Sequence, residues 1–449
     1  MSRDATHYCI KGFRSLVDFR ITLTPGLNVI VGPNGSGKTN FIEFLDFLDS
    51  LIRFGAANAV SMSGGVSKVF SVENFKKQTP VLSCEINSIA KIEGADRVGE
   101  LGLFFRFKYQ IEIKFNKSES QIYISKEKIF VNKCHSLADI TVGEQKVGSI
   151  QVTRAGPAAG HEPKFEVSKR IYATTERNPF SYIRKFGRGR DIKDVLDRIE
   201  LSTLEPDQSM ITTRPGFLAM DALRNVISRG KSFNIIPDKA RAADHISKAP
   251  NIESDGSGLS SVLHLLKRLR DGKEVNYYRY EGLPRESFDM VLHWTNLILP
   301  ELQDISINHD LHLGSYTVTL SINKEKPLKI LIQSASDGTI KWLALICLIV
   351  TNRGVGCLEE PENFLHPRMQ SFLLEIIRDT IGSSDRQDYF IISTHSETII
   401  NGCSPVELVL FRFTESGTVC GRIRDPKKVS EEINKTGFGL GYYYASNAL

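Results

Sequence analysis

The stretch GPNGSGKTN, from Gly32 to Asn40, has the residue types and spacing of a loop that binds phosphate. It fits the pattern G-x-x-x-x-G-K-[ST] in full, directly after the apolar run LNVIV and before a helical pattern. Glycines let the backbone wrap closely, so that its N–H groups point at phosphate oxygens, and a helix N-terminus adds partial positive charge. Because both flanking elements are in place, we expect a nucleoside triphosphate site here rather than an ordinary glycine-rich turn.

The positions of this loop have distinct expected roles. Lys38 would reach the β- and γ-phosphates and so assist catalysis, and the Thr39 hydroxyl would ligate Mg²⁺. ATP and Mg²⁺ are therefore the expected cofactors. The residues expected to contact the nucleotide are Asn34, Gly35, Ser36, Gly37, Lys38, Thr39 and Asn40.

Two adjacent carboxylates, Glu359 and Glu360, end a second apolar run, GVGCLEE, and a proline follows them. A phosphate loop of this kind shares its Mg²⁺ with an acid at the end of a neighbouring apolar strand. Adjacent strand residues point to opposite faces. We therefore expect Glu359 in the Mg²⁺ shell, through water, and Glu360 as the general base for the attacking water. Taken alone the pair could equally be a solvated acidic turn, but the phosphate-binding loop in the same chain favours a catalytic role.

A third apolar run, YFIISTHSETII, contains His395 just past its end. Ligand sites of α/β proteins form at the ends of strands. A lone histidine is more often structural, but this position favours contact with the γ-phosphate or with the attacking water. His395 is therefore a third expected catalytic residue.

A small polar loop, Ser336-Asp337-Gly338-Thr339, opens an apolar helix between these runs. The N–H groups of a helix N-terminus suit an anion. Yet Ser336 or Asp337 could simply cap the helix. The residues alone leave both interpretations open.

The elements that must position these residues follow from periodicity. Residues 7–32 are typical of strands, and Phe41, Leu45, Leu48 and Leu51 predict a helix after the phosphate loop. After Ser334 helices and strands alternate, as in a βαβ arrangement. The predicted fold class is α/β, a mixed sheet flanked by helices with a large insertion. The predicted domains are 1–80, an inserted lid at 81–302 (β-rich over 81–175, helical and basic over 176–302), and 303–449.

Composition sets broad limits on the class of protein. Hydrophobic residues make up 41% of the 449 residues and charged residues 24%, as in ordinary globular proteins, and the net charge is +5. The seven cysteines contain no CxxC pair, which disfavours a zinc ribbon or a disulfide framework. No apolar stretch has the length of a membrane span, and the N-terminus has no apolar signal region. We expect a cytoplasmic protein with no membrane contact.

The order of these motifs resembles that of ABC-type ATPases. The phosphate loop is followed by a long insert, then SASDGT, CLEEPENFLHP and ISTHS. More narrowly, it looks like the SMC-like branch of AAA-annotated ATPases, which includes the ATPase parts of OLD proteins, Septu PtuA and PARIS AriA. The likeness covers roughly residues 7–80 and 300–449 and is specific in the motifs. It implies a P-loop NTPase of the ABC/SMC type.

The resemblance also implies roles for particular residues. ASDGT would stand where ABC proteins carry LSGGQ, so that Ser336, Asp337 and Gly338 would contact ATP held by a second subunit. A head-to-tail homodimer or higher even oligomer with sandwiched ATP would follow. His395 would be the switch histidine. The acid usually found at Glu359 is aspartate, and the loop glutamine of the family is not identifiable, since Gln78 is a weak candidate.

The insert contains the most basic cluster of the chain, Arg184, Lys185, Arg188 and Arg190, with aromatic residues between them. Such a cluster could hold the phosphate backbone of DNA or RNA, or be an ordinary solvated loop. The insert is too short for the coiled-coil arms of SMC proteins. The chain after His395 is too short for a fused Toprim nuclease.

Three functional hypotheses follow from the motifs and the resemblance. The first is an ATPase subunit of a bacterial anti-phage system that gates a separately encoded nuclease or toxin. The second is a DNA-repair or recombination ATPase that acts on DNA itself. The third is a scaffold that binds ATP and turns it over slowly.

Overall fold

A computed structural model provides the structure of the chain. It describes residues 5–91, 104–134, 148–155, 164–171, 204–212, 223–224, 226–227, 231–273, 283–310, 312–323, 328–352, 355–382, 389–446 and 448. The predicted basic cluster of Arg184, Lys185, Arg188 and Arg190 lies outside the described residues.

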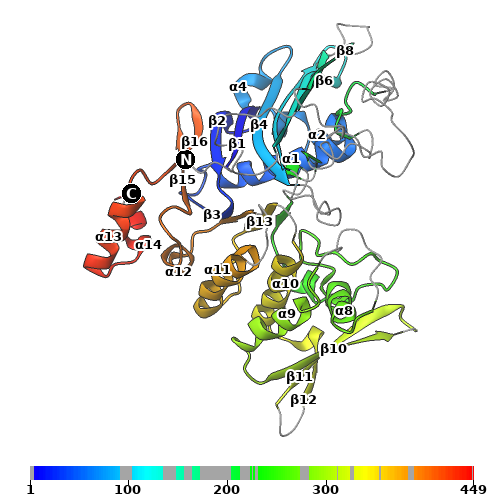
Figure 1. The fold of residues 1–449 in the computed structure, drawn as a ribbon, viewed down its shortest axis with the longest axis vertical. Coiled ribbons are helices and arrows are strands. Elements are labelled where there is room, and N and C mark those ends of the chain that lie inside the picture. Colours follow the sequence, from blue (N-terminus) through cyan, green and yellow to red (C-terminus); the bar gives the residue numbers. More distant parts are fainter. Residues whose placement is uncertain are drawn as a thin grey trace.

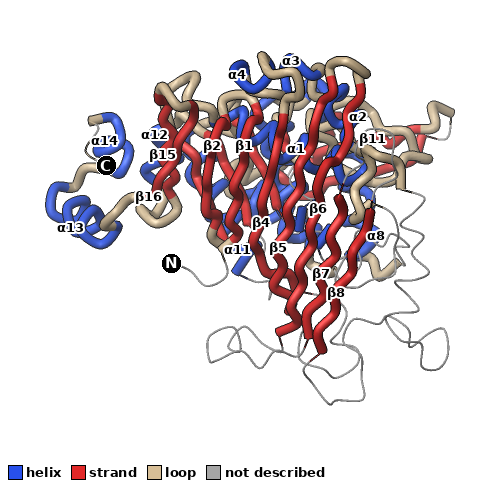
Figure 2. Tube along the Cα trace, turned by 90° about the horizontal axis from the view of Figure 1, so that it is seen from above, coloured by secondary structure: helices blue, strands red, loops and turns tan. Residues whose placement is uncertain are grey.

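A seven-stranded antiparallel sheet forms the upper part of the molecule in Figure 1, and Figure 2 shows its strands side by side. Its order is β2-β1-β4-β5-β6-β7-β8. The strands are β1 (Thr6–Phe13), β2 (Leu16–Leu23), β4 (Val81–Lys91), β5 (Phe104–Asn116), β6 (Gln121–Cys134), β7 (Gly148–Ala155) and β8 (Lys164–Ile171). Because β4 pairs directly with β1, the β-rich segment continues the sheet that the N-terminal strands begin. The division into lobe, lid and lobe stays a prediction.

A second, six-stranded sheet has the order β16-β15-β3-β14-β13-β9. Its strands are β3 (Gly26–Val31), β9 (Ser232–Phe233), β13 (Val355–Glu359), β14 (Tyr389–Ser393), β15 (Leu408–Thr414) and β16 (Gly417–Arg422). The pairings from β9 to β15 are parallel, and β16 is antiparallel to β15. This mixed sheet places the carboxyl ends of β3, β13 and β14 at one edge.

The central strands of the mixed sheet are buried on both faces, which explains their continuous apolar runs. On β14, Tyr389 and Ile391 pack in one core, and Phe390 and Ile392 pack in the other. The first core lies between the two sheets and contains α1 (Lys38–Phe54). The second contains α8 (Leu259–Arg270), α9 (Ser287–Asn296), α10 (Asp337–Thr351) and α11 (Pro367–Gly382).

Helix α1 forms where the apolar periodicity predicts a helix, and aromatic packing holds it in place. Phe41, Leu45, Leu48 and Leu51 are all buried. The Phe13 and Phe44 rings meet edge to face, with 5.2 Å between their centroids. Such pairs contribute about 0.5–1.5 kcal/mol beyond simple burial. The helix that follows the phosphate loop is therefore a rigid element.

The lower lobe combines α7 (Pro237–Ala240), α8, α9 and α10 with an antiparallel sheet of β10 (Leu302–Asp310), β11 (Ser315–Ile322) and β12 (Leu328–Leu331) (Figure 1). The short helix η5 (Ile332–Ser334) leads from β12 into α10. From Ile340 to Thr351 every residue of α10 is buried, so this helix forms the centre of the lobe.

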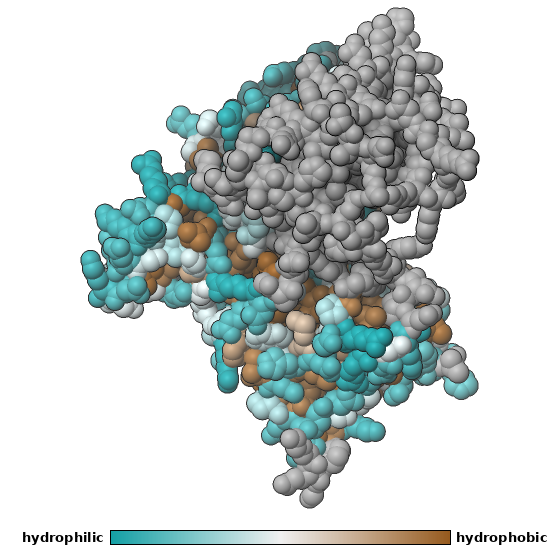
Figure 3. Space-filling model, viewed as in Figure 1, coloured by the Kyte–Doolittle hydropathy of each residue, from teal (hydrophilic) through white to brown (hydrophobic). Residues whose placement is uncertain are grey.

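Short helices complete the described fold: α2 (Ala56–Met62), α3 (Val66–Val69), α4 (Val72–Phe75), α12 (Glu397–Asn401), α13 (Pro426–Thr436) and α14 (Leu440–Ala445). In Figure 3 hydrophilic side chains predominate over the projecting α13 and α14, and hydrophobic ones gather nearer the middle of the visible face. None of the helices that the structure describes has the length and apolar character that a membrane span needs.

Candidate nucleotide-binding site

The phosphate loop lies between the end of β3 and the start of α1, as expected. Gly35 and Gly37 have φ values of +77° and +96°, which favour glycine. A Cβ atom at Gly37 would collide with the side chain of Thr418, and one at Gly32 would lie 2.5 Å from the carbonyl oxygen of Phe411. The β15–β16 hairpin therefore packs directly against the loop, a contact that no sequence motif announces.

The Lys38 side chain is turned into this loop. Its Nζ donates to the carbonyl oxygen of Gly32 at 2.8 Å and to that of Pro33 at 3.1 Å, and the residue is 7% exposed. Burial lowers the pKa of Lys38, whereas the negative charge of Glu360 acts to raise it. The lysine and the acid expected to act on the same phosphate are thus within electrostatic reach of each other.

Thr39 and Glu359 meet across the sheet edge. The Thr39 hydroxyl lies close enough to the Glu359 carboxylate to affect its pKa. Burial raises the pKa of Glu359, with further increases from Asp46 and Glu360 and an opposing effect from the Thr39 hydroxyl. A hydroxyl and a carboxylate are hard oxygen donors, which suit Mg²⁺ completed by water and phosphate oxygens. These two residues therefore fit the metal that the sequence implies.

Asp46 is a third carboxylate at this place, and no motif singled it out. It lies on α1, and its carboxylate accepts hydrogen bonds from the N–H of Ser232 at 2.8 Å and from the Ser232 hydroxyl. Burial raises the pKa of Asp46. The available signal was one of two acids inside the otherwise apolar run FIEFLDFL.

Glu360 turns away from the strand that Glu359 ends. Its φ of +42° is left-handed, its N–H donates to the carbonyl oxygen of Ser393 at 3.0 Å, and its Oε2 accepts from Asn363 at 3.2 Å. Glu359 thus interacts with Thr39, while the charge of Glu360 acts on Lys38. The two adjacent acids face different partners.

Residues 394–396, between β14 and α12, form the switch loop that contains His395, and Glu362 holds this loop. The Glu362 Oε1 accepts from the Thr394 hydroxyl at 2.8 Å and from the backbone N–H of His395 at 2.9 Å. The N–H of Thr394 donates to the carbonyl oxygen of Ile30 at 3.2 Å, which fixes the loop to the end of β3. The imidazole of His395 is left exposed.

The polar loop before α10 caps its helix through Ser336. The Ser336 Oγ accepts from the N–H of Thr339 at 3.3 Å. Asp337 is exposed and ion-pairs with Arg241, which also donates to the carbonyl oxygen of Gln333 at 3.2 Å. Within the described part of the chain, the polar contacts of residues 336–338 stay in the lower lobe and do not reach the phosphate loop of the same chain.

Two other candidates lie elsewhere. Asn40 donates to the Ser15 hydroxyl at 2.6 Å, which places it against the β1–β2 turn. Gln78 donates to the Ser118 hydroxyl at 2.9 Å, at the turn between β5 and β6. Among the hydrogen bonds that the structure describes, neither side chain contacts the acids of the site.

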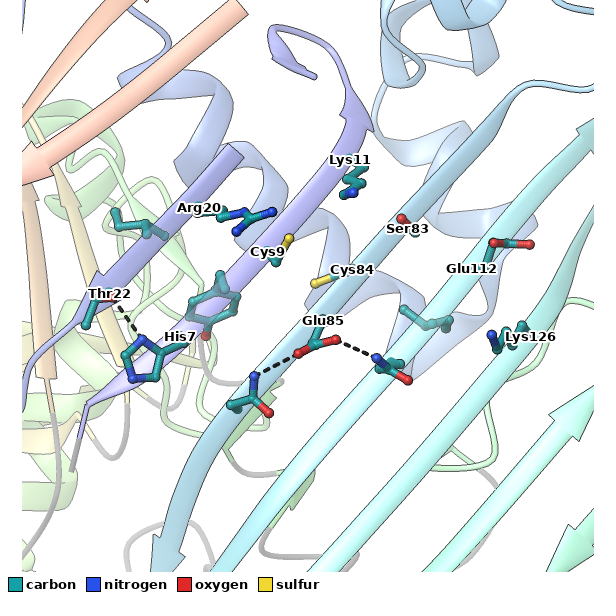
Figure 4. Close-up of a pocket in the computed structure, with 15 residues that line it drawn as sticks. His7, Cys9, Lys11, Arg20, Thr22, Ser83, Cys84, Glu85, Glu112 and Lys126 are labelled. Atoms are coloured by element: carbon teal, nitrogen blue, oxygen red, sulfur yellow. Dashed lines mark hydrogen bonds between the residues drawn. The ribbon is translucent and has the colours of Figure 1, made fainter. Parts of the chain in front are cut away.

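A hollow of about 620 Å³ lies on the outer face of the seven-stranded sheet (Figure 4). Its lining mixes acids and bases, among them Lys11, Arg20, Glu85, Glu112 and Lys126. Glu85 accepts from Asn87 and Gln110, and His7 bonds to Thr22. Both acids are paired with lysines of the sheet, Glu85 with Lys108 and Glu112 with Lys114, so the hollow presents no unpaired carboxylate among the described residues.

A family model described as "AAA domain, putative AbiEii toxin, Type IV TA system" matches residues 27–401. The chain belongs to this AAA domain family. The matched region of the chain runs from β3 to the end of α12 and contains the phosphate loop, the acid pair and the switch loop. The expected α/β fold class, with a phosphate loop between strand and helix and a mixed sheet flanked by helices, is confirmed.

Curated relatives match shorter stretches of the AAA domain. The chain is 36% identical over 66 residues to the DNA replication and repair protein RecF of Streptomyces avermitilis, which is 12% of this chain and 18% of the relative. It is 42% identical over 59 residues to RecF of Beutenbergia cavernae, 11% and 15% of the two chains. The matched part of the chain thus spans less than a fifth of the length of these relatives.

Solved structures of SMC heads are similar to the AAA domain in coarse arrangement. An SMC head bound to the C-winged helix domain of ScpA has a TM-score of 0.42 and 11% identity, covering 94% of this chain and 98% of that one. The SMC head domain from Thermotoga maritima has a TM-score of 0.38 and 10% identity, covering 94% and 100%.

Proposed function

We propose that this AAA domain binds ATP with Mg²⁺ at residues 34–40 and hydrolyses it, in an even-numbered oligomer that places the loop at 336–338 against the nucleotide of a second copy. The observation that carries the proposal is the meeting of Lys38, Thr39, Glu359 and Glu360 at the ends of β3 and β13. Family membership supports nucleotide hydrolysis in general.

In this proposal each residue has one task. Lys38 turns from the loop carbonyls to the β- and γ-phosphates of ATP. Glu360 accepts a proton from the attacking water, and His395 orients that water or the γ-phosphate. Thr39 and Glu359 would hold Mg²⁺, which when bound supplies positive charge to the developing negative charge on phosphate. Glu362 keeps the His395 backbone in place.

The biological role we propose is that of a cytoplasmic ATPase subunit in a bacterial anti-phage system. Nucleotide turnover would gate a separately encoded nuclease or toxin. The support is the motif order of the SMC-like branch and the toxin–antitoxin description of the matching family. Coexpression with the neighbouring genes, followed by native mass spectrometry with and without ATP and Mg²⁺, should show a complex with a second protein. A bare oligomer under every condition would contradict gating of a partner.

A DNA-repair ATPase is the second candidate, because the curated relatives are RecF proteins whose names describe DNA replication and repair. In that case DNA should stimulate ATP turnover by the chain alone. Reversing the charges of Arg184, Arg188 and Arg190 should then weaken DNA or RNA binding and flatten its salt dependence. Unchanged binding would remove the basic cluster from consideration.

The catalytic assignment has a direct test in Glu360→Gln. This variant should keep ATP binding, lose turnover by about a hundredfold or more, and accumulate an ATP-bound dimer. Lys38→Ala should instead lose ATP binding. A wild-type chain that binds ATP, together with a Glu360→Gln variant that behaves identically, would favour the slow scaffold and overturn the hydrolytic role.

A further inference from the structure

A lysine without a hydrogen-bond partner lies buried beneath the acidic loop at 359–365. Lys341, on α10, is 1% exposed, and its Nζ makes no hydrogen bond to the described residues. Burial lowers its pKa from 10.5 to about 8, and the negative charges of Glu362 and Glu360 act in the opposite direction. A buried ammonium destabilises the folded state unless an opposite charge lies near it.

Glu362 supplies the complementary group. Its Oε2 is also buried and makes no hydrogen bond to the described residues, while its Oε1 holds Thr394 and the N–H of His395. The negative charge of the Glu362 carboxylate acts on the Lys341 ammonium, as does that of Glu360. The carboxylate that fixes the switch loop therefore also acts, through its charge, on a cation on the helix of the polar loop.

Two contacts fix the acidic loop on the same helix. The Lys341 Nζ lies 5.8 Å from the centroid of the Phe364 ring, whose face attracts cations. A Cβ at Gly338 would lie 3.0 Å from the Phe364 carbonyl oxygen. Phe364 itself is 62% exposed and left-handed, at φ +67°. The first turns of α10 thus contain Lys341 and lie next to the loop at 336–338, which would face a second copy.

We propose that Lys341 is a positioning residue, which holds Glu362 and through it the His395 backbone, and so couples the loop at 336–338 to the switch loop. The proposal rests on the hydrolytic function proposed above. It assigns Lys341 no contact with the nucleotide. It requires a positive charge at this position, not merely a side chain of matching size.

The first test needs no turnover. Hydrogen exchange of a peptide covering residues 393–401 should be faster in Lys341→Met than in the wild type, because the His395 N–H loses its fixed acceptor. Lys341→Arg, which keeps the charge, should exchange like the wild type. Methionine also removes a buried ammonium without leaving a cavity, so global unfolding should not explain the change. Equal exchange in Lys341→Met and the wild type would overturn the proposal.

The second test separates positioning from binding. Lys341→Met should keep ATP affinity within about twofold and lower kcat by about tenfold, and Lys341→Arg should restore most of that loss. Because burial lowers the pKa of Lys341 to about 8, its positive charge is lost above that pH. The kcat of the wild type should therefore fall above pH 8, and the kcat of Lys341→Arg should not. Full activity of Lys341→Met in an active wild-type background would refute this role alone. Absence of ATP binding by the wild type would instead refute the proposed function.

A double variant provides the final control. If Lys341 acts through Glu362, Lys341→Met combined with Glu362→Gln should reduce kcat no further than Glu362→Gln alone. Losses that multiply would show that the two residues act independently.

Discussion

The carboxylate of Asp46, on α1, accepts hydrogen bonds from both the N–H and the hydroxyl of Ser232, on β9. Strand β9 pairs in parallel with β13 at Cys357 and Leu358. One acid therefore links the helix that follows the phosphate loop to the edge of the strand that carries Glu359.

Replacing Asp46 should loosen this edge. Asp46→Ala leaves two donors of Ser232 without their acceptor, and should lower the free energy of unfolding by about 1–3 kcal/mol. Asp46→Asn keeps an acceptor oxygen and should lose less. Urea denaturation of the two variants beside the wild type measures the difference. Three equal midpoints would mean that β9 is not held by this carboxylate.

Gly37 should tolerate no side chain. Gly37→Ala forces a left-handed φ of +96° on alanine and drives its Cβ into Thr418, so ATP binding should be lost and the hairpin β15–β16 displaced. Gly26→Ala is the matched control, because Gly26 has φ +97° with no atom within 4 Å of its Cβ. The control should lose only about 1 kcal/mol of stability from backbone strain. Titration with a fluorescent ATP analogue distinguishes the two. Similar affinity in both variants would show that the Thr418 contact does not shape the loop.

The stability of the folded chain should rise with pH through the range in which Lys341 titrates. Its pKa is about 8 when folded and 10.5 ordinarily, so between these values the unfolded chain binds more protons at this residue. Stability then increases with pH, by up to about 3 kcal/mol. Lys341→Met should be the more stable protein at pH 7, and its advantage should disappear near pH 10.5.

Denaturation curves of the two proteins at pH 7, 8, 9 and 10 measure this difference, and the subtraction removes the titration of every other lysine. An advantage that stays constant with pH would mean that Lys341 keeps an ordinary pKa.

Arg241 should affect assembly more than folding. It clamps Gln333 and Asp337, on either side of Ser336, from the lower lobe. Because the Arg241–Asp337 ion pair is partly exposed, Arg241→Met should change the free energy of unfolding by at most about 1 kcal/mol. If the loop at 336–338 faces a second copy, the ATP-induced dimer should dissociate several-fold more readily. Sedimentation at graded concentrations measures this, and unchanged dimerisation would separate Asp337 from the interface.

Motifs in the sequence predicted the parts of the site that lie next to one another along the chain. The strand, loop and helix around Lys38 could be foreseen because every glycine and the flanking apolar runs are local. Different directions for Glu359 and Glu360 were expected because neighbouring strand residues point apart, but Glu360 lies just beyond the strand and its left-handed backbone turns it away.

The rest depends on contacts between distant segments. Asp46 meets Ser232 only because a two-residue strand joins the sheet edge, and such a strand carries no readable period. Lys341 looked like one polar residue in a buried helix, and only the packing of α10 under Phe364 shows which charges it faces. The continuity of β4 with β1 was equally invisible, since strand pairing is a property of the whole sheet.

The contact between Gly37 and Thr418 joins residues near opposite ends of the chain. A chain emerging from the ribosome has its phosphate loop long before the hairpin that presses on it has been made. The phosphate loop can therefore reach the packing seen in the structure only after synthesis has passed Thr418, so most of the chain must exist before this part of the site is complete.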